Sequence, residues 1–398
     1  MSSEANVAEV SSHSAAERAA RAGVATLVLM SLGHFFVDLY SGALGALQPL
    51  LVDRFGTNLT QAGILGGLLV FFSSVMQPVY GFLSDRYHTR MFTVLAPATA
   101  GIFISSLGLA PSYVWMLPMV VLGGTGIASF HPQASARVAF GSTDRRGIAM
   151  AIFISAGALG YALGPTFFSG ITGALGLSRS YWAAVPGVVL TLLLFPLLPP
   201  APSSMTHPRN RFDWKVLRAV RKPLTILYVL VFIRSIIQIT FGQFLPLYLH
   251  LEKGFPVSRA NYALSGYLAA GALGGFLGGH LADRFGGRTV ILLSMAGSLP
   301  FLALFFFGSG WASLLGLILG GFILLFTIPV NVVMAQELAP TQAGTVSALM
   351  MGFAWGTAGL IFIPLTGWAS DLFSMHNVLA SLLVFPVVGF FLTLKLKK

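Results

Sequence analysis

Two long stretches of this chain carry no ionised side chain, and they restrict its possible folds more than any other feature. No Asp, Glu, Lys or Arg occurs between Arg90 and Arg137, or between Arg288 and Glu337. A bilayer-spanning helix needs about 20 apolar residues, and an ionised side chain at its centre costs about 2.5 kcal/mol or more. Because only 9% of the residues are charged and 56% are hydrophobic, a water-soluble enzyme and a disordered chain are both excluded.

Each of the two stretches is too long for one helix and has a break near its middle, at residues 110–112 and 308–310. Each therefore predicts two helices joined by a tight hairpin. The first span is expected over about residues 23–51. Six shorter charge-free stretches predict one span each, namely residues 57–84, 147–178, 180–208, 260–282, 338–370 and 372–394, and residues 224–251, interrupted only by Arg234, predict one more. The predicted class is an all-α polytopic membrane protein with twelve transmembrane helices.

The positive charges indicate the orientation and the division into domains. Most Lys and Arg residues fall in loops and tails on the side of both termini, which the positive-inside rule places in the cytoplasm. The formal net charge of +11 is therefore a topology signal, and nucleic acid is not an expected partner. Residues 1–22 are expected to form a disordered cytoplasmic tail. Residues 201–222 are expected to link an N-terminal bundle, 23–200, to a C-terminal bundle, 223–398.

The chain contains an internal repeat. The segment from Gly81 to Tyr87 matches the segment from Gly279 to Phe285 at an offset of 198 residues. Each copy stands just before one of the long charge-free stretches. Because each half contains an even number of helices, the two halves are expected to share one orientation and to be related by an axis along the membrane normal.

The repeated segment resembles the loop between the second and third helices of the major facilitator superfamily. The resemblance implies two six-helix bundles related by a pseudo-twofold axis along the membrane normal. It also implies a monomeric secondary transporter of a small molecule in the inner membrane of a bacterium, embedded in the lipid bilayer, without cofactor or catalytic residue. The residues that match the motif are Gly81, Asp85, Arg86 and Arg90 in the first copy and Gly279, Asp283, Arg284 and Arg288 in the second.

The two aspartates of this motif predict a cytoplasmic gate. A carboxylate is stabilised at the positive N-terminus of a neighbouring helix. Asp85 is expected to meet the start of the eleventh helix and Asp283 the start of the fifth, so both contacts would hold the halves together on the cytoplasmic side. The alternative is a solvated turn whose Arg residues only determine topology.

The fifth helix carries a glycine-rich pattern that resembles the motif of proton-coupled exporters. Gly157, Gly160 and Gly164 lie on the helix with Pro165. Small residues four apart allow another helix to approach closely, and proline removes one helical hydrogen bond. The pattern predicts a seal towards the outer side, or else a general packing face.

Ionisable side chains at membrane depth are functional candidates, since burial is tolerated only beside a cavity or a partner. His34 and Asp38 are four residues apart and share a helix face, and His131 lies in the fourth helix. We expect Asp38 to carry a proton, assisted by His34 and His131, or else to form a fixed structural pair. Arg234 is the expected contact for an anion in a central cavity. The other expected cavity residues are Tyr40, Gln133, Gln238, Gln243, Asn331 and Trp355.

A narrower resemblance is to the fosmidomycin-resistance group of this superfamily. It is carried by residues 31–34 with Asp38, by Gln77 and Pro78, and by residues 124–126 with His131. The resemblance implies a drug/proton antiporter that exports a phosphonate antibiotic in exchange for protons, although Gln133 replaces the Glu that commonly follows His-Pro. Proton-coupled uptake of an organic anion or sugar is the alternative. A membrane receptor or enzyme would require a sensor domain or a catalytic cluster, and no metal site or ATP-binding loop is expected.

Overall fold

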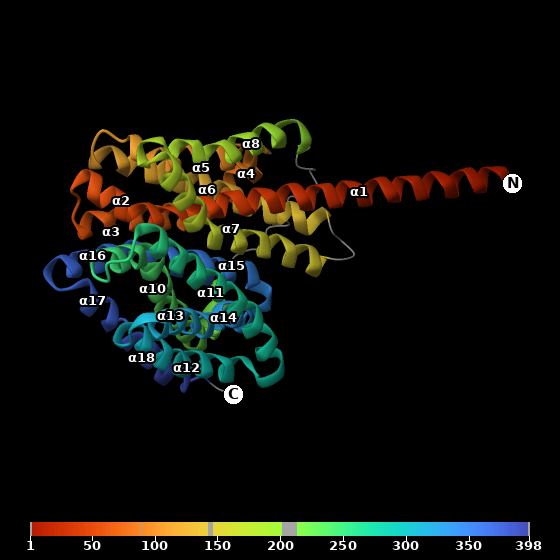
Figure 1. Cartoon of the computed structure of the whole chain (residues 1–398). Coiled ribbons are helices and arrows are strands. Elements are labelled where there is room, and N and C mark those ends of the chain that lie inside the picture. Colours follow the sequence, from red (N-terminus) through yellow and green to blue (C-terminus); the bar gives the residue numbers. More distant parts are fainter. Residues whose placement is uncertain (1, 88, 142–145, 201–212, 397–398) are drawn as a thin grey trace.

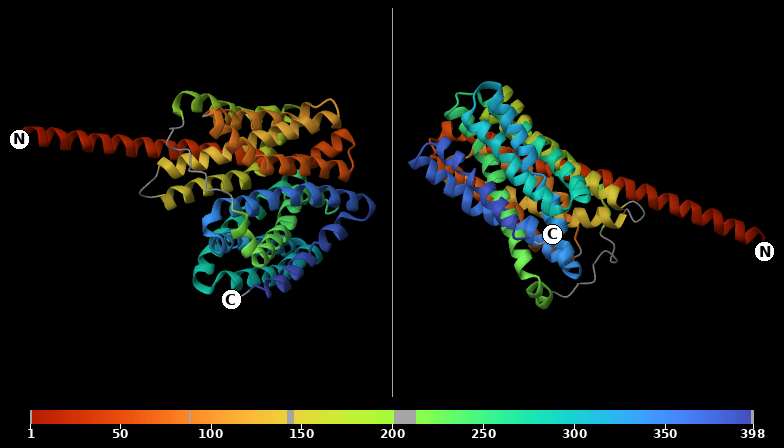
Figure 2. Two further views of the ribbon diagram at one scale, coloured as in Figure 1. Left: turned by 180° about the vertical axis from the view of Figure 1, so that it is seen from behind. Right: turned by 90° about the horizontal axis from the view of Figure 1, so that it is seen from below.

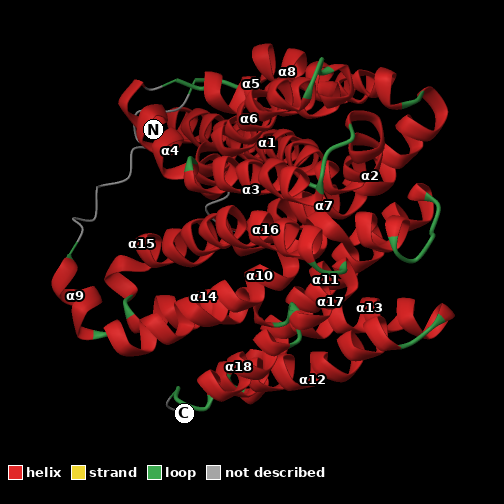
Figure 3. Cartoon of the chain, turned by 90° about the vertical axis from the view of Figure 1, so that its left-hand side faces the viewer, coloured by secondary structure: helices red, strands yellow, loops and turns green. Residues whose placement is uncertain are grey.

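The computed structural model describes residues 2–87, 89–141, 146–200 and 213–396, and every regular element in these ranges is helical (Figure 3). Side chains are described from Ala22 onward, apart from that of Asp85. The elements form two bundles that lie side by side, one from each half of the chain (Figures 1 and 2). This is the predicted architecture.

The first bundle contains the first six spans. They are α1 (Ser2–Ser41) with α2 (Ala43–Phe55), α3 (Leu59–Val75) with α4 (Gln77–Tyr87), α5 (Met91–Ser105) with η1 (Ser106–Leu109), α6 (Tyr113–Gly141), α7 (Arg146–Leu175), and η2 (Leu177–Ala184) with α8 (Val185–Leu197). The short helix α9 (Trp214–Ala219) precedes the second bundle.

The second bundle contains the last six spans. They are α10 (Arg221–Leu251), α11 (Val257–Phe285), α12 (Gly287–Phe307), α13 (Gly310–Leu324) with α14 (Thr327–Leu338), η4 (Pro340–Gln342) with α15 (Ala343–Ser347), the π-helical η5 (Ala348–Phe353) and α16 (Ala354–Leu372), and α17 (Met375–Ser381) with α18 (Val384–Thr393). The two predicted hairpins are confirmed, since α6 begins after the break at 110–112 and α13 begins at Gly310.

Eleven of the spans are long and apolar enough to cross a bilayer by composition alone. The twelfth is α11, whose last turns carry His280, Asp283 and Arg284 and whose interior is rich in glycine. At 29 residues it is about 43 Å long, enough to cross. Because α11 packs between α7 and α13, neighbouring helices and not lipid cover much of its surface.

Two segments differ in the structure from their predicted form. Residues 2–22, expected to be disordered, form the first half of the continuous helix α1. This segment is rich in Ala, Glu and Arg, which favour helix. Because it continues the apolar part of α1, it extends an existing helix and needs no nucleation of its own. The linker is also shorter than expected. Residues 201–212 lie outside the described part, but Asp213 caps α9 through the amide of Lys215, and α10 begins at Arg221.

The internal repeat reappears as a repeated contact. A Cβ on Gly81 would lie 3.4 Å from Pro132, and a Cβ on Gly279 would lie 3.6 Å from Pro329. The two glycines occupy matching positions in the repeat, and so do the two prolines. In each half, the glycine therefore lets the end of the second span lie against the proline of the fourth.

The two bundles contact each other mainly along three helix pairs, α3 with α16, α7 with α11, and α2 with α10. We call the end that carries residues 86–91 and α9 the linker end, and the end that carries the turns at Gly56 and Gly254 the far end. At the far end, Thr166 of α7 donates its backbone N–H and its hydroxyl to Ser265 Oγ of α11, over 3.1 and 2.8 Å. Both bonds join the two halves, so the far end is closed.

Candidate functional site

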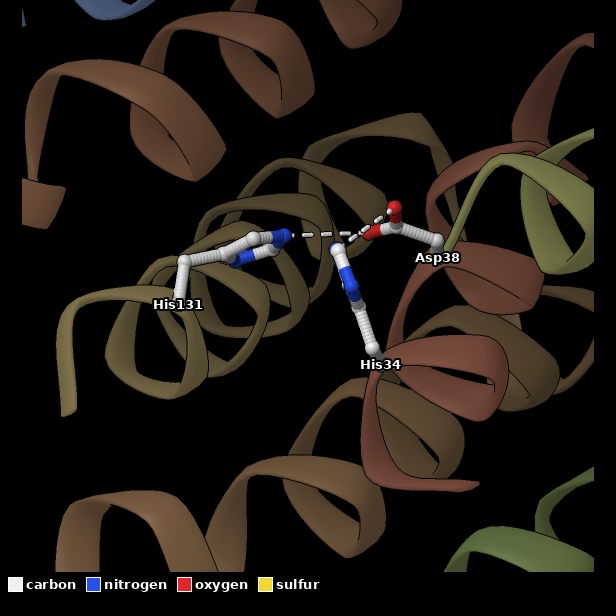
Figure 4. Close-up of side chains that lie close together, drawn as sticks. All are labelled: His34, Asp38 and His131. Carbon is white, nitrogen blue, oxygen red and sulfur yellow. Dashed lines mark hydrogen bonds and ion pairs between the residues drawn. The ribbon is translucent and has the colours of Figure 1, made fainter. Parts of the chain in front are cut away.

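Three ionisable side chains converge inside the first bundle. His34 and Asp38 lie on α1 and His131 lies on α6, and both imidazoles point at the one carboxylate (Figure 4). Nε2 of His34 lies 3.3 Å from Oδ2 of Asp38, and Nε2 of His131 lies 3.2 Å from Oδ1. The side chains of Asp38 and His131 remain 19% and 21% exposed, so the cluster is reachable. We call these three residues the triad.

The second nitrogen of each imidazole is held by the backbone. Nδ1 of His34 lies 2.8 Å from the carbonyl oxygen of Phe153, and Nδ1 of His131 lies 2.9 Å from that of Ile127. A carbonyl oxygen only accepts hydrogen bonds, so both Nδ1 atoms carry a proton and donate it. Each ring therefore presents Nε2 to Asp38 in a fixed orientation.

Neighbouring small and aromatic residues shape the pocket around His34. Its ring stacks on Phe153 with 4.2 Å between centroids. A Cβ on Gly157 would clash with the His34 ring, and a Cβ on Gly33 would lie 2.5 Å from a ring carbon of Phe130. The His34 imidazole of α1 fills the space that a side chain at position 157 of α7 would need, so this position requires glycine.

The rest of the predicted glycine motif also faces α1. A Cβ on Gly160 would clash with the carbonyl oxygen of Phe35, and one on Gly164 with that of Leu39. Since α1 and α7 belong to the same bundle, these glycines form a packing face within the first bundle in this state. Pro165 lacks the N–H that would bond to Tyr161 O, and Gly42 packs against that freed carbonyl.

Arg234 lies in the second bundle, on α10, and is buried with 5% exposure. Its Nη1 donates to Gln238 Oε1 over 2.6 Å, and its guanidinium lies 5.7 Å from the ring centroid of Trp355. Its Nε is buried without a hydrogen-bond partner. Among the residues that the structure describes, no carboxylate forms an ion pair with it.

Two tyrosines connect the triad with Arg234, and sequence reasoning missed both. Tyr161 of α7 lies within electrostatic range of Asp38, Tyr267 of α11 lies within range of Tyr161, and Arg234 lies within range of Tyr267. The Tyr267 hydroxyl is buried and has no hydrogen-bond partner among the described residues. These side chains form a succession of polar groups near the boundary between the bundles, and the Tyr161 hydroxyl reaches α10, where a Cβ on Gly242 would lie 3.4 Å from it.

Two residues expected to line the cavity lie elsewhere. Tyr40 is fully buried in the first bundle, where its hydroxyl donates to Ala183 O over 2.9 Å and accepts from Gly187 N over 3.0 Å. Gln133 bonds to Thr93, Ser84 and Thr89 of its own bundle. Both side chains have satisfied their polar atoms in the core, so neither faces a cargo.

Two further predicted cavity residues keep unpaired polar atoms. Gln243 of α10 packs against Gly66 of α3, across the boundary between the halves, and its Oε1 has no partner. Asn331 of α14 is fully buried, and neither polar atom of its side chain bonds to any residue that the structure describes. Buried polar groups of this kind are unusual and remain available to a bound molecule.

Among the residues that the structure describes, no contact of the expected cytoplasmic gate is seen. Asp283 is exposed and, among the described residues, makes no hydrogen bond or ion pair, while the side chain of Asp85 lies outside the described part. The arginines of the motif take local partners: Arg86 lies over Tyr87, Arg90 over Phe195 and Arg284 over Phe285, and Arg288 donates to Leu394 O. The prediction assigns these gate contacts to the opposite state, in which the cytoplasmic side is closed.

At the far end, a gate contact that the sequence did not reveal joins the halves. Asp371, at the end of α16, accepts hydrogen bonds from Leu59 N over 2.9 Å, from Thr60 N over 2.8 Å and from Thr60 Oγ1 over 2.6 Å. The donors belong to the first turn of α3, whose positive end favours a carboxylate. We call this contact the far-end latch.

The triad is also where three side chains of metal-ligand type meet. Their ligand atoms lie within 4.8 Å of one another. In this structure, however, both carboxylate oxygens and both Nε2 atoms are already paired with each other. The contacts present are a hydrogen bond between His131 and Asp38 and an ion pair between His34 and Asp38.

Comparison with known sequences identifies the family. The model of the Major Facilitator Superfamily matches residues 30–354 and again residues 227–398. The chain is 29% identical over 384 residues to the fosmidomycin resistance protein of Escherichia coli (strain K12), covering 93% of this chain and 92% of the other. It is 25% identical over 289 residues to the multidrug resistance protein MdtG of Escherichia coli O17:K52:H18, covering 68% and 69%.

Solved structures show the same fold. A bacterial homologue of the human lysosomal transporter Spinster, in an inward-facing and unoccupied conformation, matches with a TM-score of 0.76 at 16% identity and covers 94% of this chain and 96% of the other. The nucleoside transporter NupG matches with a TM-score of 0.77 at 14% identity, covering 94% and 100%. With two six-helix bundles, a repeated glycine–proline contact and a family model that matches most of its length, this chain belongs to the Major Facilitator Superfamily.

Proposed function

We propose that this protein is a proton-coupled exporter of small organic compounds, with phosphonate antibiotics as a cargo class, and that it works by alternating access between its two bundles. The single observation that carries the proposal is the triad, in which two imidazoles converge on one membrane-depth carboxylate. Such groups are costly inside a membrane unless they bind a proton or a charged ligand. The family supplies the transport class, and the relative from Escherichia coli supplies the cargo class.

The distribution of Lys and Arg supports the orientation. It puts both termini and the linker end in the cytoplasm of a bacterial cell, with the protein in the inner membrane. With the far end closed and Asp283 without a partner among the described residues, we infer that this state is the one that opens to the cytoplasm. Nothing in the proposed cycle requires more than one copy of the chain.

In this cycle Asp38 binds and releases the proton. A nearby imidazolium stabilises the carboxylate, whereas loss of that contact in a buried site favours the protonated acid. Movement of His34 or His131 relative to Asp38 would therefore load and unload the site. The partial exposure of Asp38 gives the proton a route to it.

Arg234 is the proposed contact for the cargo. Its free Nε and its bond to Gln238 place a positive group beside two further polar side chains, and Trp355 covers its face. A phosphonate or carboxylate would supply the missing counter-charge through charge-assisted hydrogen bonds. Tyr267 extends this site towards the first bundle.

A second candidate is proton-coupled uptake of a small organic anion, and one observation favours it. A proton-loaded triad and Arg234 both carry positive charge, and the two lie in one succession of polar groups. An anion at Arg234 would thus favour protons on the triad, and the reverse holds by linkage. Such positive coupling suits movement of anion and protons in the same direction.

Transport in everted membrane vesicles separates the two candidates. These vesicles expose the cytoplasmic face, so an exporter driven by an acidic lumen accumulates labelled fosmidomycin inside. The variant Asp38→Asn should lose gradient-driven accumulation and serves as the matched control. If an acidic lumen instead expels preloaded fosmidomycin, the export proposal is wrong and the uptake candidate replaces it.

A further inference from the structure

We propose that the triad binds two exchangeable protons, one at each contact between an imidazole Nε2 and Asp38, so that two protons move per transport cycle. The inference rests on the proposed function and adds a number to it. It depends on which atoms of the triad already hold protons, and the geometry of His34 and His131 decides that.

The backbone fixes the tautomer of both imidazoles. The carbonyl oxygens of Phe153 and Ile127 each require a proton on the Nδ1 atom that faces them. In a neutral imidazole, the other nitrogen is then a bare lone pair. Without additional protons, Nε2 of His34 and Nε2 of His131 would both present lone pairs to Asp38.

The contacts to Asp38 are attractive only if a proton lies in each of them, in the hydrogen bond from His131 over 3.2 Å and in the ion pair with His34 at 3.3 Å. The carboxylate uses Oδ2 for His34 and Oδ1 for His131, so each contact has its own oxygen. A single proton would satisfy one contact and leave two lone pairs facing each other in the second. The observed arrangement is therefore the state with two protons and a net charge of +1, however the protons divide among the three groups.

The surroundings support this charge. The ring of His34 stacks on Phe153 at 4.2 Å, and an aromatic face attracts a cation. The helices against α1 supply few other titrating groups. Tyr161 is the described titratable group from α7 that faces Asp38, the Tyr40 hydroxyl is bonded to Ala183, and Arg137 of α6 bonds Pro199 at the linker end.

Removal of both protons would change the net charge of the triad from +1 to −1. The carboxylate would then face two lone pairs about 3.2 Å away, which is repulsive, so the three side chains must separate or admit water. Release of the second proton is thus linked to a change in geometry. This is the link that a coupled transporter requires between proton binding and conformation.

A null-point measurement in proteoliposomes counts the protons. With the membrane potential clamped at zero, the pH gradient that just stops fosmidomycin flux is measured against a tenfold fosmidomycin gradient. Each proton transported per fosmidomycin molecule balances a tenfold fosmidomycin concentration ratio for every pH unit. Two protons therefore stop the flux at a gradient of about 0.5 pH unit, and one proton stops it at about 1 pH unit. We expect about 0.5 for the wild type and for His280→Gln, whose side chain is exposed, and about 1 for His131→Gln.

A titration without cargo gives a second count. Purified wild-type protein and the triple variant His34→Gln, Asp38→Asn, His131→Gln are titrated between about pH 5 and 9, and we expect the wild type to bind two protons more. A null at about 1 pH unit in the wild type, or a difference of one bound proton, overturns the two-proton inference but leaves proton coupling intact. Fosmidomycin flux that no pH gradient can stop overturns the proposed function instead, and the titration then decides the proton count alone.

Discussion

Asp371 holds the far end closed in this account, so its replacement should open that end. Asp371→Ala removes three hydrogen bonds to Leu59 and Thr60 and the charge at the positive end of α3. A side-chain cap of this kind is worth about 0.5–2 kcal/mol, and the charge at a helix terminus about 0.3–1 kcal/mol. Since Asp371 is exposed, we take about 1–2 kcal/mol for the sum, which raises the population of the open far end about 5- to 30-fold.

The chain contains no cysteine, so a single introduced thiol reports this opening. Ala62 of α3 is 1% exposed and packs against the second bundle. A membrane-impermeant maleimide is added at the far side to protein that carries Ala62→Cys. Asp371→Ala should increase the rate of labelling by the same factor as the open population, about 5- to 30-fold. This holds when opening is fast relative to labelling, because the rate then follows the open population.

Glu252→Ala is the matched control for this measurement. Glu252 accepts bonds from Met375 N over 2.6 Å and His376 N over 2.8 Å, which is a comparable helix cap but lies wholly within the second bundle. Its loss should lower thermal stability without changing the labelling of Cys at position 62. Equal labelling rates for Asp371→Ala and its parent would refute the latch.

Three further predictions concern the site. Gly157→Ala should displace the His34 ring and abolish gradient-driven accumulation in vesicles, whereas Gly170→Ala, where a Cβ meets nothing within 4 Å, should transport normally; equal activity of the two would contradict the packing argument. Arg234→Ala should weaken fosmidomycin binding about 10- to 150-fold in calorimetry, as expected for loss of about 1.5–3 kcal/mol of charged hydrogen bonding, and unchanged affinity removes Arg234 from the cargo site. Gln133→Leu should lower the melting temperature, because it leaves buried partners unpaired, yet keep the affinity for fosmidomycin; weaker binding without loss of stability would return Gln133 to the cavity.

The fold was predictable because its main determinant is local. A membrane helix requires an uninterrupted apolar stretch, and the charges that interrupt this sequence mark the ends of most spans. The tail was not predictable from polarity alone. Residues 2–22 are polar, but they continue an apolar helix and consist largely of good helix formers, so α1 extends through them.

The site was predictable only in part, because several partners are distant in sequence. His34 and Asp38 share a face by helical spacing, but no local signal brings His131 to the same carboxylate. Tyr40 and Gln133 are polar at membrane depth in the same way as Gln238, and only their hydrogen bonds show that they belong to the core. The sequence contains the Asn58–Gln61 pair that caps α3 locally.

The far-end latch illustrates the same limit. Asp371 ends a charge-free stretch like other acids of the loops, and its donors lie more than 300 residues earlier. A capping signal was present at Asn58, but it could not reveal that a second carboxylate from α16 completes the cap. Pairings of this kind follow from how the two bundles dock.

Proton movement driven by cargo tests the central claim most directly. Proteoliposomes containing a pH-sensitive dye are given a fosmidomycin gradient, and the internal pH is followed for the wild type and for Asp38→Asn. An asparagine can donate from Nδ2 to the Nε2 of one imidazole and its own side chain binds no proton, so most of the local structure should persist while the carboxylate's role is lost. We predict that the gradient changes the internal pH in the wild type only, while Asp38→Asn still exchanges labelled for unlabelled fosmidomycin. An equal pH change in both proteins would contradict the assignment of coupling to the triad.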